Sequence, residues 1–245
     1  MLNLKNHPFS VETFFESSLV LTYAVQKAEL ENLIPECLSL DTFDDKWAFI
    51  AIALVQTKDL RPKGFPPFMG NDFFLAGFRV FVRYTNNKGK RLRGLYILKS
   101  ETNKLKMSFF GNIFTHYNYT TTDIKFVKEL KRINITSLKS DLDIEVKTIG
   151  EVVPLPKDSP FKDWKEARRF AGPLPFTFTY NSKAKEVLII EGVRQNWIPQ
   201  PVEVIRSQVG FIREKKFNSI VLANAFLIEN VPYYWRKGKI EIWRG

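Results

Sequence analysis

Short stretches of β-forming residues, separated by turn residues, follow one another along almost the whole chain, and this pattern constrains the fold most. The clearest lies at residues 46–56, where WAFIAIALV is nearly all apolar, as expected of a strand buried on both faces. Predicted strands outnumber predicted helices by about five to one, without the strand–helix alternation of a parallel sheet. We therefore expect a mainly β protein with a strongly curved, largely antiparallel sheet, forming a barrel or cone that encloses a central cavity.

Turn residues locate two hairpins and one long loop. The strands at 73–84 and 91–99 flank Asn86-Asn87-Lys88-Gly89, and those at 175–180 and 186–192 flank residues 181–185. Residues 58–72 hold three prolines and two glycines, which predicts an irregular loop, either a functional lid or an ordered crossover packed by Phe65 and Phe68. Further strands are expected at 18–25, 38–43, 106–110, 114–122, 142–148, 202–212 and 221–229.

Only two short helices are predicted. Residues 26–34 change to a helical period, and Pro35 ends that helix. Asp163 and Glu166 have the spacing of a capping box and open a second helix, which ends before Gly172-Pro173. No linker, repeat or low-complexity stretch divides these elements, so residues 1–245 are interpreted as one domain.

Charge and cysteine content restrict the class of protein. The net charge is +11, from 37 Lys plus Arg against 26 Asp plus Glu, which raises nucleic acid as a partner. The basic residues are scattered and carry no nucleic-acid motif, which argues against that partner. The lone Cys37 excludes an internal disulfide and a multi-cysteine metal site. Without a signal-peptide core or a long apolar segment, we expect a cytoplasmic protein that needs neither membrane, metal nor cofactor.

The familiar catalytic motifs are missing, since neither phosphate-binding glycine pattern nor a Gly-x-Ser-x-Gly elbow occurs. Three weaker groups of residues remain. Alternation places Arg79 and Arg83 on one strand face, where they either bind a carboxylate in a cavity or lie in solvent. His116 offers a proton carrier and Tyr117 and Tyr119 offer donors, against the alternative of a structural histidine. Arg168, beside Arg169 on the second predicted helix, either reaches a pocket or forms a structural salt bridge.

Several ordered segments resemble one known family. They comprise residues 33–57 (LIPECLSLDTFDDKWAFIAIALVQT), FFLAGFRVFVR at 73–83, residues 93–96, GNIFTHYNY at 111–119 and DWKEARRFAGPLPF at 163–176. Over most of its length the chain resembles the YqjF-like family of unknown function (domain of unknown function 2071). That family is similar to acetoacetate-decarboxylase-like proteins, and the resemblance implies their large curved β fold with a central cavity.

The same resemblance implies Schiff-base chemistry only if a lysine pair is present. Decarboxylases of that superfamily use a lysine set beside a second one after a Gly-Phe-Pro turn, and the neighbouring cation lowers its pKa. Here Gly64-Phe65-Pro66 is followed by Pro67-Phe68, and the only adjacent pair is Lys215-Lys216, in a polar stretch late in the chain. Lys99 and Lys106 lie nearer the expected region without the motif. Whether the chain is an enzyme is left open.

These observations lead to one hypothesis with two alternatives. We expect a protein that binds a small organic carboxylate, with or without a reaction on a keto acid. The alternatives are a non-catalytic ligand-binding or interaction module, and nucleic-acid binding through net charge. The candidate cavity-lining residues are Arg79, Arg83, Tyr96, His116, Tyr117 and Arg168. The sequence gives no oligomeric state.

Overall fold

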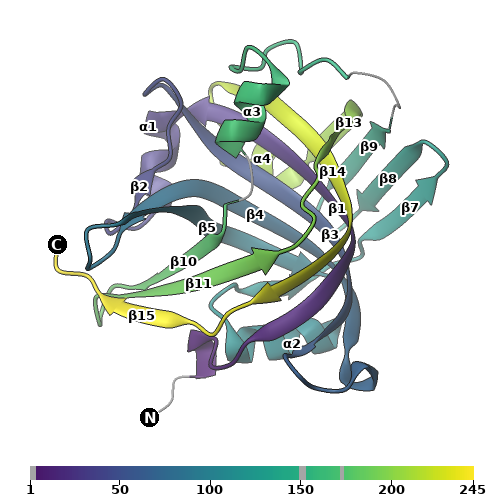
Figure 1. The fold of residues 1–245 in the computed structure, drawn as a ribbon. Coiled ribbons are helices and arrows are strands. Elements are labelled where there is room, and N and C mark those ends of the chain that lie inside the picture. The colour runs from purple at the N-terminus through teal and green to yellow at the C-terminus, as the bar shows by residue number, and fades with distance from the viewer. Residues whose placement is uncertain (1–3, 149–152, 172–173) are drawn as a thin grey trace.

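The main feature of the fold is a curled sheet whose strands close into a ring (Figure 1). The structure is a computed structural model that describes residues 4–148, 153–171 and 174–245. The ring runs in the order β1–β3–β4–β5–β10–β11–β14 and returns from β14 to β1. Its strands are β1 (Val11–Gln26), β3 (Trp47–Pro62), β4 (Asn71–Thr85), β5 (Arg91–Thr102), β10 (Phe176–Asn181), β11 (Glu186–Arg194) and β14 (Ile220–Trp235).

Neighbouring strands of the ring pair antiparallel, except that β5 and β10 pair parallel. Both predicted hairpins are present. In the first, the Asn86 amide donates to Lys90 O at 3.0 Å, and Gly89 adopts a positive φ of 74° at the turn. The short strands β2 (Ser39–Leu40), β6 (Tyr119–Thr121), β12 (Gln200–Pro201) and β15 (Lys239–Ile242) add to the margins. The expected mainly β, strongly curved and largely antiparallel fold is confirmed.

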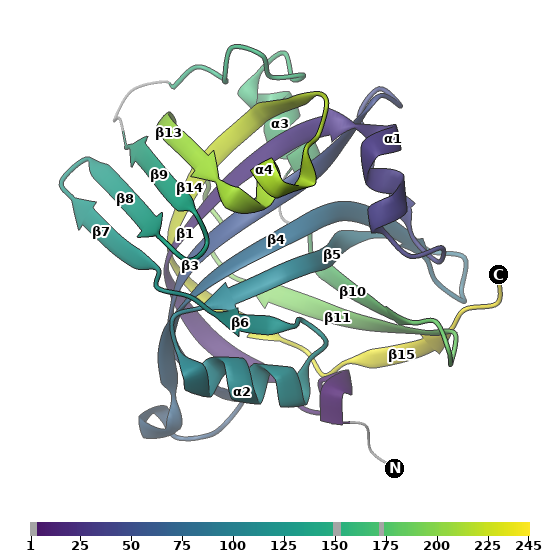
Figure 2. The ribbon, with the colours of Figure 1, turned by 180° about the vertical axis from the view of Figure 1, so that it is seen from behind.

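A second, four-stranded sheet packs against the outside of the ring (Figure 2). It has the order β13–β9–β8–β7, from β13 (Glu203–Val209), β9 (Leu142–Lys147), β8 (Arg132–Ser137) and β7 (Lys125–Glu129). Its apolar side chains, such as Ile133 and Ile144, are fully buried with Leu19 and Leu54 of the ring. Burial against this sheet explains why strands such as β3 are apolar on both faces.

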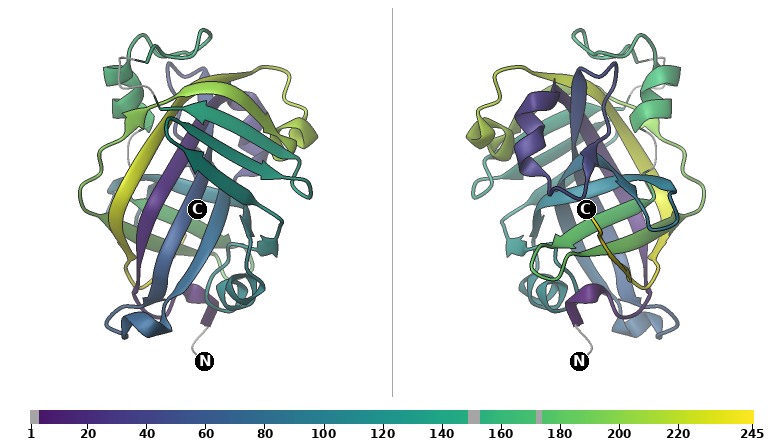
Figure 3. Two further views of the ribbon diagram at one scale, coloured as in Figure 1. Left: turned by 90° about the vertical axis from the view of Figure 1, so that its right-hand side faces the viewer. Right: turned by 90° about the vertical axis from the view of Figure 1, so that its left-hand side faces the viewer.

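Helices cover the two ends of the ring and part of its outer face (Figures 1 and 3). They are α1 (Lys27–Leu30), α2 (Leu105–Phe114), α3 (Trp164–Ala171) and α4 (Gly210–Lys215), with 3-10 turns η1 (Leu4–Asn6), η2 (Glu31–Leu33) and η3 (Pro67–Met69). The predicted cap of α3 is confirmed, because the Glu166 amide donates to Asp163 Oδ1 at 2.7 Å. In the described ranges no helix has the length and apolarity needed to cross a membrane.

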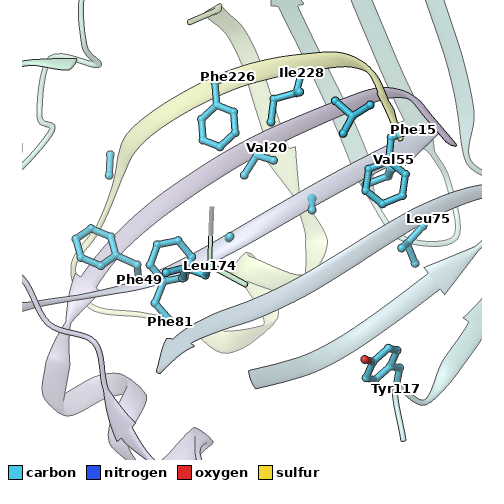
Figure 4. Close-up of a cluster of buried hydrophobic side chains, with 14 of the residues drawn as sticks. Phe15, Val20, Phe49, Val55, Leu75, Phe81, Tyr117, Leu174, Phe226 and Ile228 are labelled. Carbon is cyan, nitrogen blue, oxygen red and sulfur yellow. The ribbon is translucent and has the colours of Figure 1, made fainter. Parts of the chain in front are cut away.

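Strand alternation separates an inner from an outer core. On β4, Phe81 belongs to the inner cluster, whereas Phe78 and Val80 pack outside the ring. Figure 4 shows the inner cluster, in which large side chains such as Phe49 and Phe226 surround the interior of the ring. Arg79, Phe81 and Arg83 therefore share the inner face, as alternation predicts.

One predicted strand was wrong and two were too long. Residues 105–114 form α2, where a strand at 106–110 was expected. Of the strand expected at 114–122 only β6 is present, and the strand expected at 202–212 ends with β13 and is followed by α4. In α2, Ser108 Oγ and Asn112 Nδ2 both donate to Tyr119 O at 2.9 Å, so contacts with β6 hold the helix. The loop at 58–72 is shorter than expected, because β3 continues to Pro62 and β4 begins at Asn71.

Candidate functional site

Arg79 lies on the inner face of β4, above small neighbours. Its direct cross-strand neighbour on β3 is Ala51, and Ala53 lies opposite Gly77 one row away. A Cβ on Gly77 would lie 2.8 Å from Arg79 Nε and 2.9 Å from Nη2, so the guanidinium lies directly over this glycine. Arg79 Nε is buried without a hydrogen-bond partner in the described residues. The small side chains of the sheet thus leave room for a cation inside the ring.

Unpaired polar groups continue along the same row of the inner face. Cross-strand pairing runs from Arg79 to Ala51, then to Thr22 on β1 and to Asn224 on β14. Thr22 is 0% and Asn224 1% exposed. Thr22 Oγ1 and both polar atoms of the Asn224 side chain have no partner among the described residues. The interior is therefore polar along one row within an otherwise apolar lining.

A second arginine enters the interior from the far side of the ring. Arg194 ends β11 directly opposite Tyr233 of β14, and its guanidinium lies 4.5 Å from the ring centroid of Trp197. Burial lowers the pKa of Arg194, and Tyr233 partly offsets this by raising it. The charge of Arg79 lowers the same pKa further, so the two guanidiniums are close enough to interact. Neither arginine has an ion-pair partner in the part of the chain that the structure describes. Two positive charges therefore face one interior without a counter-charge among the described residues.

Three tyrosines lie near Arg79, and one of them, Tyr233, also lies beside Arg194. Tyr117 and Tyr119 reach the interior from the α2–β6 segment, and the Tyr233 hydroxyl packs directly on Gly192, where a Cβ could not fit. Burial raises the pKa of all three phenols, that of Tyr119 to about 12, while Arg79 lowers each. At neutral pH they are uncharged donors.

Tyr117 lies at the edge of the interior, where it also lines a pocket. Its hydroxyl is buried and, although Thr177 lies nearby, no hydrogen bond of acceptable geometry to it is present in the described residues. Figure 4 shows its ring at the edge of the inner cluster. Tyr117 and Tyr119 also line a pocket of about 360 Å³ that opens beside α2. These two tyrosines therefore connect the pocket to the surroundings of Arg79.

Arg83, the other predicted arginine of β4, is already paired. Asp41, which is 0% exposed, forms ion pairs with Arg83 and with its cross-strand neighbour Arg93, whose Nε lies 2.6 Å from Asp41 Oδ2. Arg93 Nη2 also donates to Phe170 O at 2.8 Å. This Asp41–Arg83–Arg93 triad joins β4 and β5 to the end of α3. Arg83 therefore has a structural partner that Arg79 lacks.

The remaining predicted residues lie apart from Arg79. Tyr96 is opposite Val80 and packs outside the ring. His116 Nε2 lies 3.0 Å from Asn6 Oδ1, and the side chain lines a separate pocket of about 320 Å³ with Tyr180. Arg168 is exposed on α3, and the side chain of Arg169 lies outside the described part of the chain. The structure thus brings Arg79 and Tyr117 together, but not Tyr96, His116 or Arg168.

The two lysines considered for Schiff-base chemistry also lie outside the interior. Lys99 is opposite Phe78, on the outer side of the sheet, and its Nζ lies 2.8 Å from Glu101 Oε1. Lys106 is exposed on α2, at the rim of the apolar pocket. Among the described residues, two groups near Arg79 were missed by sequence reasoning, Arg194 and Tyr233, whereas Tyr119 was predicted as a donor together with Tyr117. Continuing the alternation of Leu188 and Ile190 two steps beyond the predicted end of β11 would have found Arg194.

The sequence comparison identifies the family. Residues 14–240 match DUF2071, described as an uncharacterized conserved protein (COG2071). The chain belongs to this family. A comparison with curated proteins finds no match.

Solved structures similar to this DUF2071 chain share its fold at low sequence identity. An acetoacetate decarboxylase from Legionella pneumophila is similar with a TM-score of 0.61 and 11% identity, over 96% of this chain and 88% of that one. The enduracididine biosynthesis enzyme MppR complexed with pyruvate is similar with a TM-score of 0.56 and 8% identity, over 95% of this chain and 90% of that one. An acetoacetate decarboxylase-like enzyme from Sphingomonas wittichii RW1 is similar with a TM-score of 0.51 and 10% identity, over 97% of this chain and 92% of that one. The chain therefore has the acetoacetate-decarboxylase-like fold.

Proposed function

We propose that this DUF2071 protein binds a small organic carboxylate inside the ring, with Arg79 and Arg194 as cationic contacts and Tyr117 as a neutral donor. One observation carries the proposal: two guanidiniums face the same interior, and neither is paired with a carboxylate of the described chain. Both side chains are half-buried, where an unpaired charge loses part of its hydration, and arginines in folded proteins are mostly exposed or paired.

The chemistry of the surrounding groups favours an anion. A guanidinium matches the planar fork of a carboxylate, and charge-assisted hydrogen bonds are about twice as strong as neutral ones. Two like charges in one interior repel each other, so a bound anion relieves the repulsion and supplies the missing acceptor. The hydroxyl of Tyr117 lies near Thr177 but makes no well-aligned hydrogen bond in the described residues, so it can donate to the same carboxylate.

The fold neighbours support a keto acid as one class of ligand, since one of them was solved with pyruvate and others carry the name acetoacetate decarboxylase. Schiff-base chemistry is a second candidate that these names favour. It needs a lysine inside the ring, whereas Lys99 is paired with Glu101 and Lys106 is exposed. We therefore expect borohydride treatment with acetoacetate to leave the protein mass unchanged, and a trapped adduct would restore the second candidate.

The test of binding compares carboxylates with neutral analogues of the same length, for example hexanoate with hexanamide, by thermal shift and calorimetry. Carboxylates should raise the Tm because they bind the native state only. Replacing Arg79 or Arg194 by Met should weaken binding about 10- to 100-fold, the value of one charge-assisted hydrogen bond. Arg168→Met, the same substitution at an exposed position of α3, is the control. Equal responses to carboxylate and amide, or undiminished binding in both interior variants, would refute the proposal.

A further inference from the structure

The pocket beside α2 is large compared with a three- or four-carbon keto acid. Its volume is about 360 Å³. At roughly 30 Å³ per non-hydrogen atom, the share of one water molecule in the liquid, this space holds about a dozen such atoms. Pyruvate has six and acetoacetate seven. A ligand of that size would leave much of the pocket unfilled.

The walls of the pocket are apolar almost throughout. The apolar side chains that line it come from three elements: Phe73 and Leu75 from β4, Met107 and Phe110 from α2, and Trp235 from β14. Such surfaces bind hydrocarbon because its transfer from water is favourable by roughly 25 cal/mol per Å². A short polar keto acid makes little use of these walls.

Two of the polar side chains that line the pocket lead toward Arg79. Tyr117 and Tyr119 both line the pocket and lie close enough to Arg79 to respond to its charge. The charged side chains that line the pocket are Arg61 and Lys106, and Lys106 is exposed at its rim. The pocket therefore combines apolar walls with hydrogen-bonding groups, and two of these, Tyr117 and Tyr119, lie on the side of Arg79.

Exposed apolar side chains continue the apolar walls at the mouth of the pocket. Met69 and Phe110 line the pocket and are 47% and 44% exposed. On the same two segments Phe68 is 86% and Phe109 63% exposed. Exposed apolar side chains gathered around a pocket are typical of a ligand-binding groove. The mouth is thus built to admit hydrocarbon rather than to exclude it.

We infer that the ligand is an amphipathic monocarboxylate with an apolar tail of roughly six to ten carbons, the tail in this pocket and the carboxylate between Tyr117 and Arg79. This inference rests on the proposed function and narrows its ligand class.

The test is a series of straight-chain carboxylates from butanoate to decanoate, titrated calorimetrically below their micelle-forming concentrations, with alcohols of equal length alongside. Each added methylene should tighten binding by up to about fourfold until the pocket is full, since a buried methylene contributes about 0.8 kcal/mol. The comparison uses the unaltered protein, so it does not depend on the folding of any variant.

Two variants separate head from tail. Phe110→Glu places a charge on the pocket wall and should abolish the dependence on chain length, whereas Phe65→Glu, at a residue outside the pocket with similar exposure of 47%, should keep it. Arg79→Met should weaken the binding of every carboxylate in the series by a similar factor. Binding that needs Arg79 but does not vary with chain length would overturn the amphipathic ligand and leave the proposed function intact. If affinity rises with chain length equally for alcohols and carboxylates, and Arg79→Met leaves it unchanged, the proposed carboxylate site itself is overturned.

Discussion

Replacing Asp41 by Asn tests whether the triad with Arg83 and Arg93 holds the inner face together. Asp41 is 0% exposed, and its two oxygens each contact a different arginine. The variant keeps the shape of the side chain but leaves two guanidiniums facing a neutral amide. Arg93 would then be held chiefly by its hydrogen bond to Phe170 O.

The expected loss follows from the burial of the three groups. Removing one partner of a fully buried ion pair costs about 3–5 kcal/mol, because the other charge stays buried and uncompensated. The arginine side chains are 24% and 36% exposed, so solvent screens part of the remaining charge. We expect a decrease of about 2–4 kcal/mol in the free energy of unfolding, which lowers Tm by roughly 5–15 °C for a chain of this length.

The assay is urea unfolding followed by tryptophan fluorescence, with thermal unfolding as a second measurement. Asp45→Asn is the matched control, because Asp45 forms a 2.8 Å ion pair with Lys27 but is 84% exposed. That control should lose at most about 1 kcal/mol. Equal losses in the two variants, or a loss below about 1 kcal/mol for Asp41→Asn, would show that the triad does not stabilise the fold as argued.

Three further predictions concern single side chains. Gly77→Ala should keep the fold but displace the Arg79 guanidinium, weakening carboxylate binding at least about tenfold by calorimetry; unchanged affinity would contradict the close approach. Burial raises the pKa of the Cys37 thiol to about 12, so a thiol-specific reagent at pH 8 should label Cys37 only in denaturant, and rapid labelling of the native protein would disprove this. Burial lowers the pKa of His7, so the unfolded state binds more protons, and the free energy of unfolding should fall as the pH decreases below about 6.5. His7→Gln should reduce this dependence of stability on pH, and an unaltered dependence would exclude His7 as its cause.

The sequence predicted elements whose determinants are local and missed those set by distant contacts. Helix α3 was predicted because Asp163 caps it, whereas α2 begins after Lys104 without a capping side chain or an acidic first turn. What holds α2 is its pair of hydrogen bonds to Tyr119 O, which alternation and propensity do not reveal. Its aromatic residues favour a strand by propensity, and tertiary contacts override that preference.

Residues of the candidate site were likewise predicted where their position follows from local sequence and missed where it depends on distant contacts. The inward direction of Arg79 follows from alternation within β4 and was predicted. The pairing of Val80 with Tyr96, which directs Tyr96 outward, depends on the register between β4 and β5. The meeting of Arg79 with Arg194 depends on closure of the ring by β11 and β14, strands that only the folded chain brings together.

The β10–β11 hairpin joins the rest of the ring through two short seams. Three residue pairs connect β10 to β5 and three connect β11 to β14, whereas β1 pairs with β3 and β14 along almost its whole length. Amide hydrogens at these seams should exchange with solvent sooner than those of β1 and β3, because few hydrogen bonds must break for the hairpin to open. Arg194 lies on this hairpin and Arg79 lies on β4, so the two cations are held together only while the seams are closed. An anion that bridges them must therefore slow exchange at both seams, which links occupancy of the interior to the local stability of one hairpin.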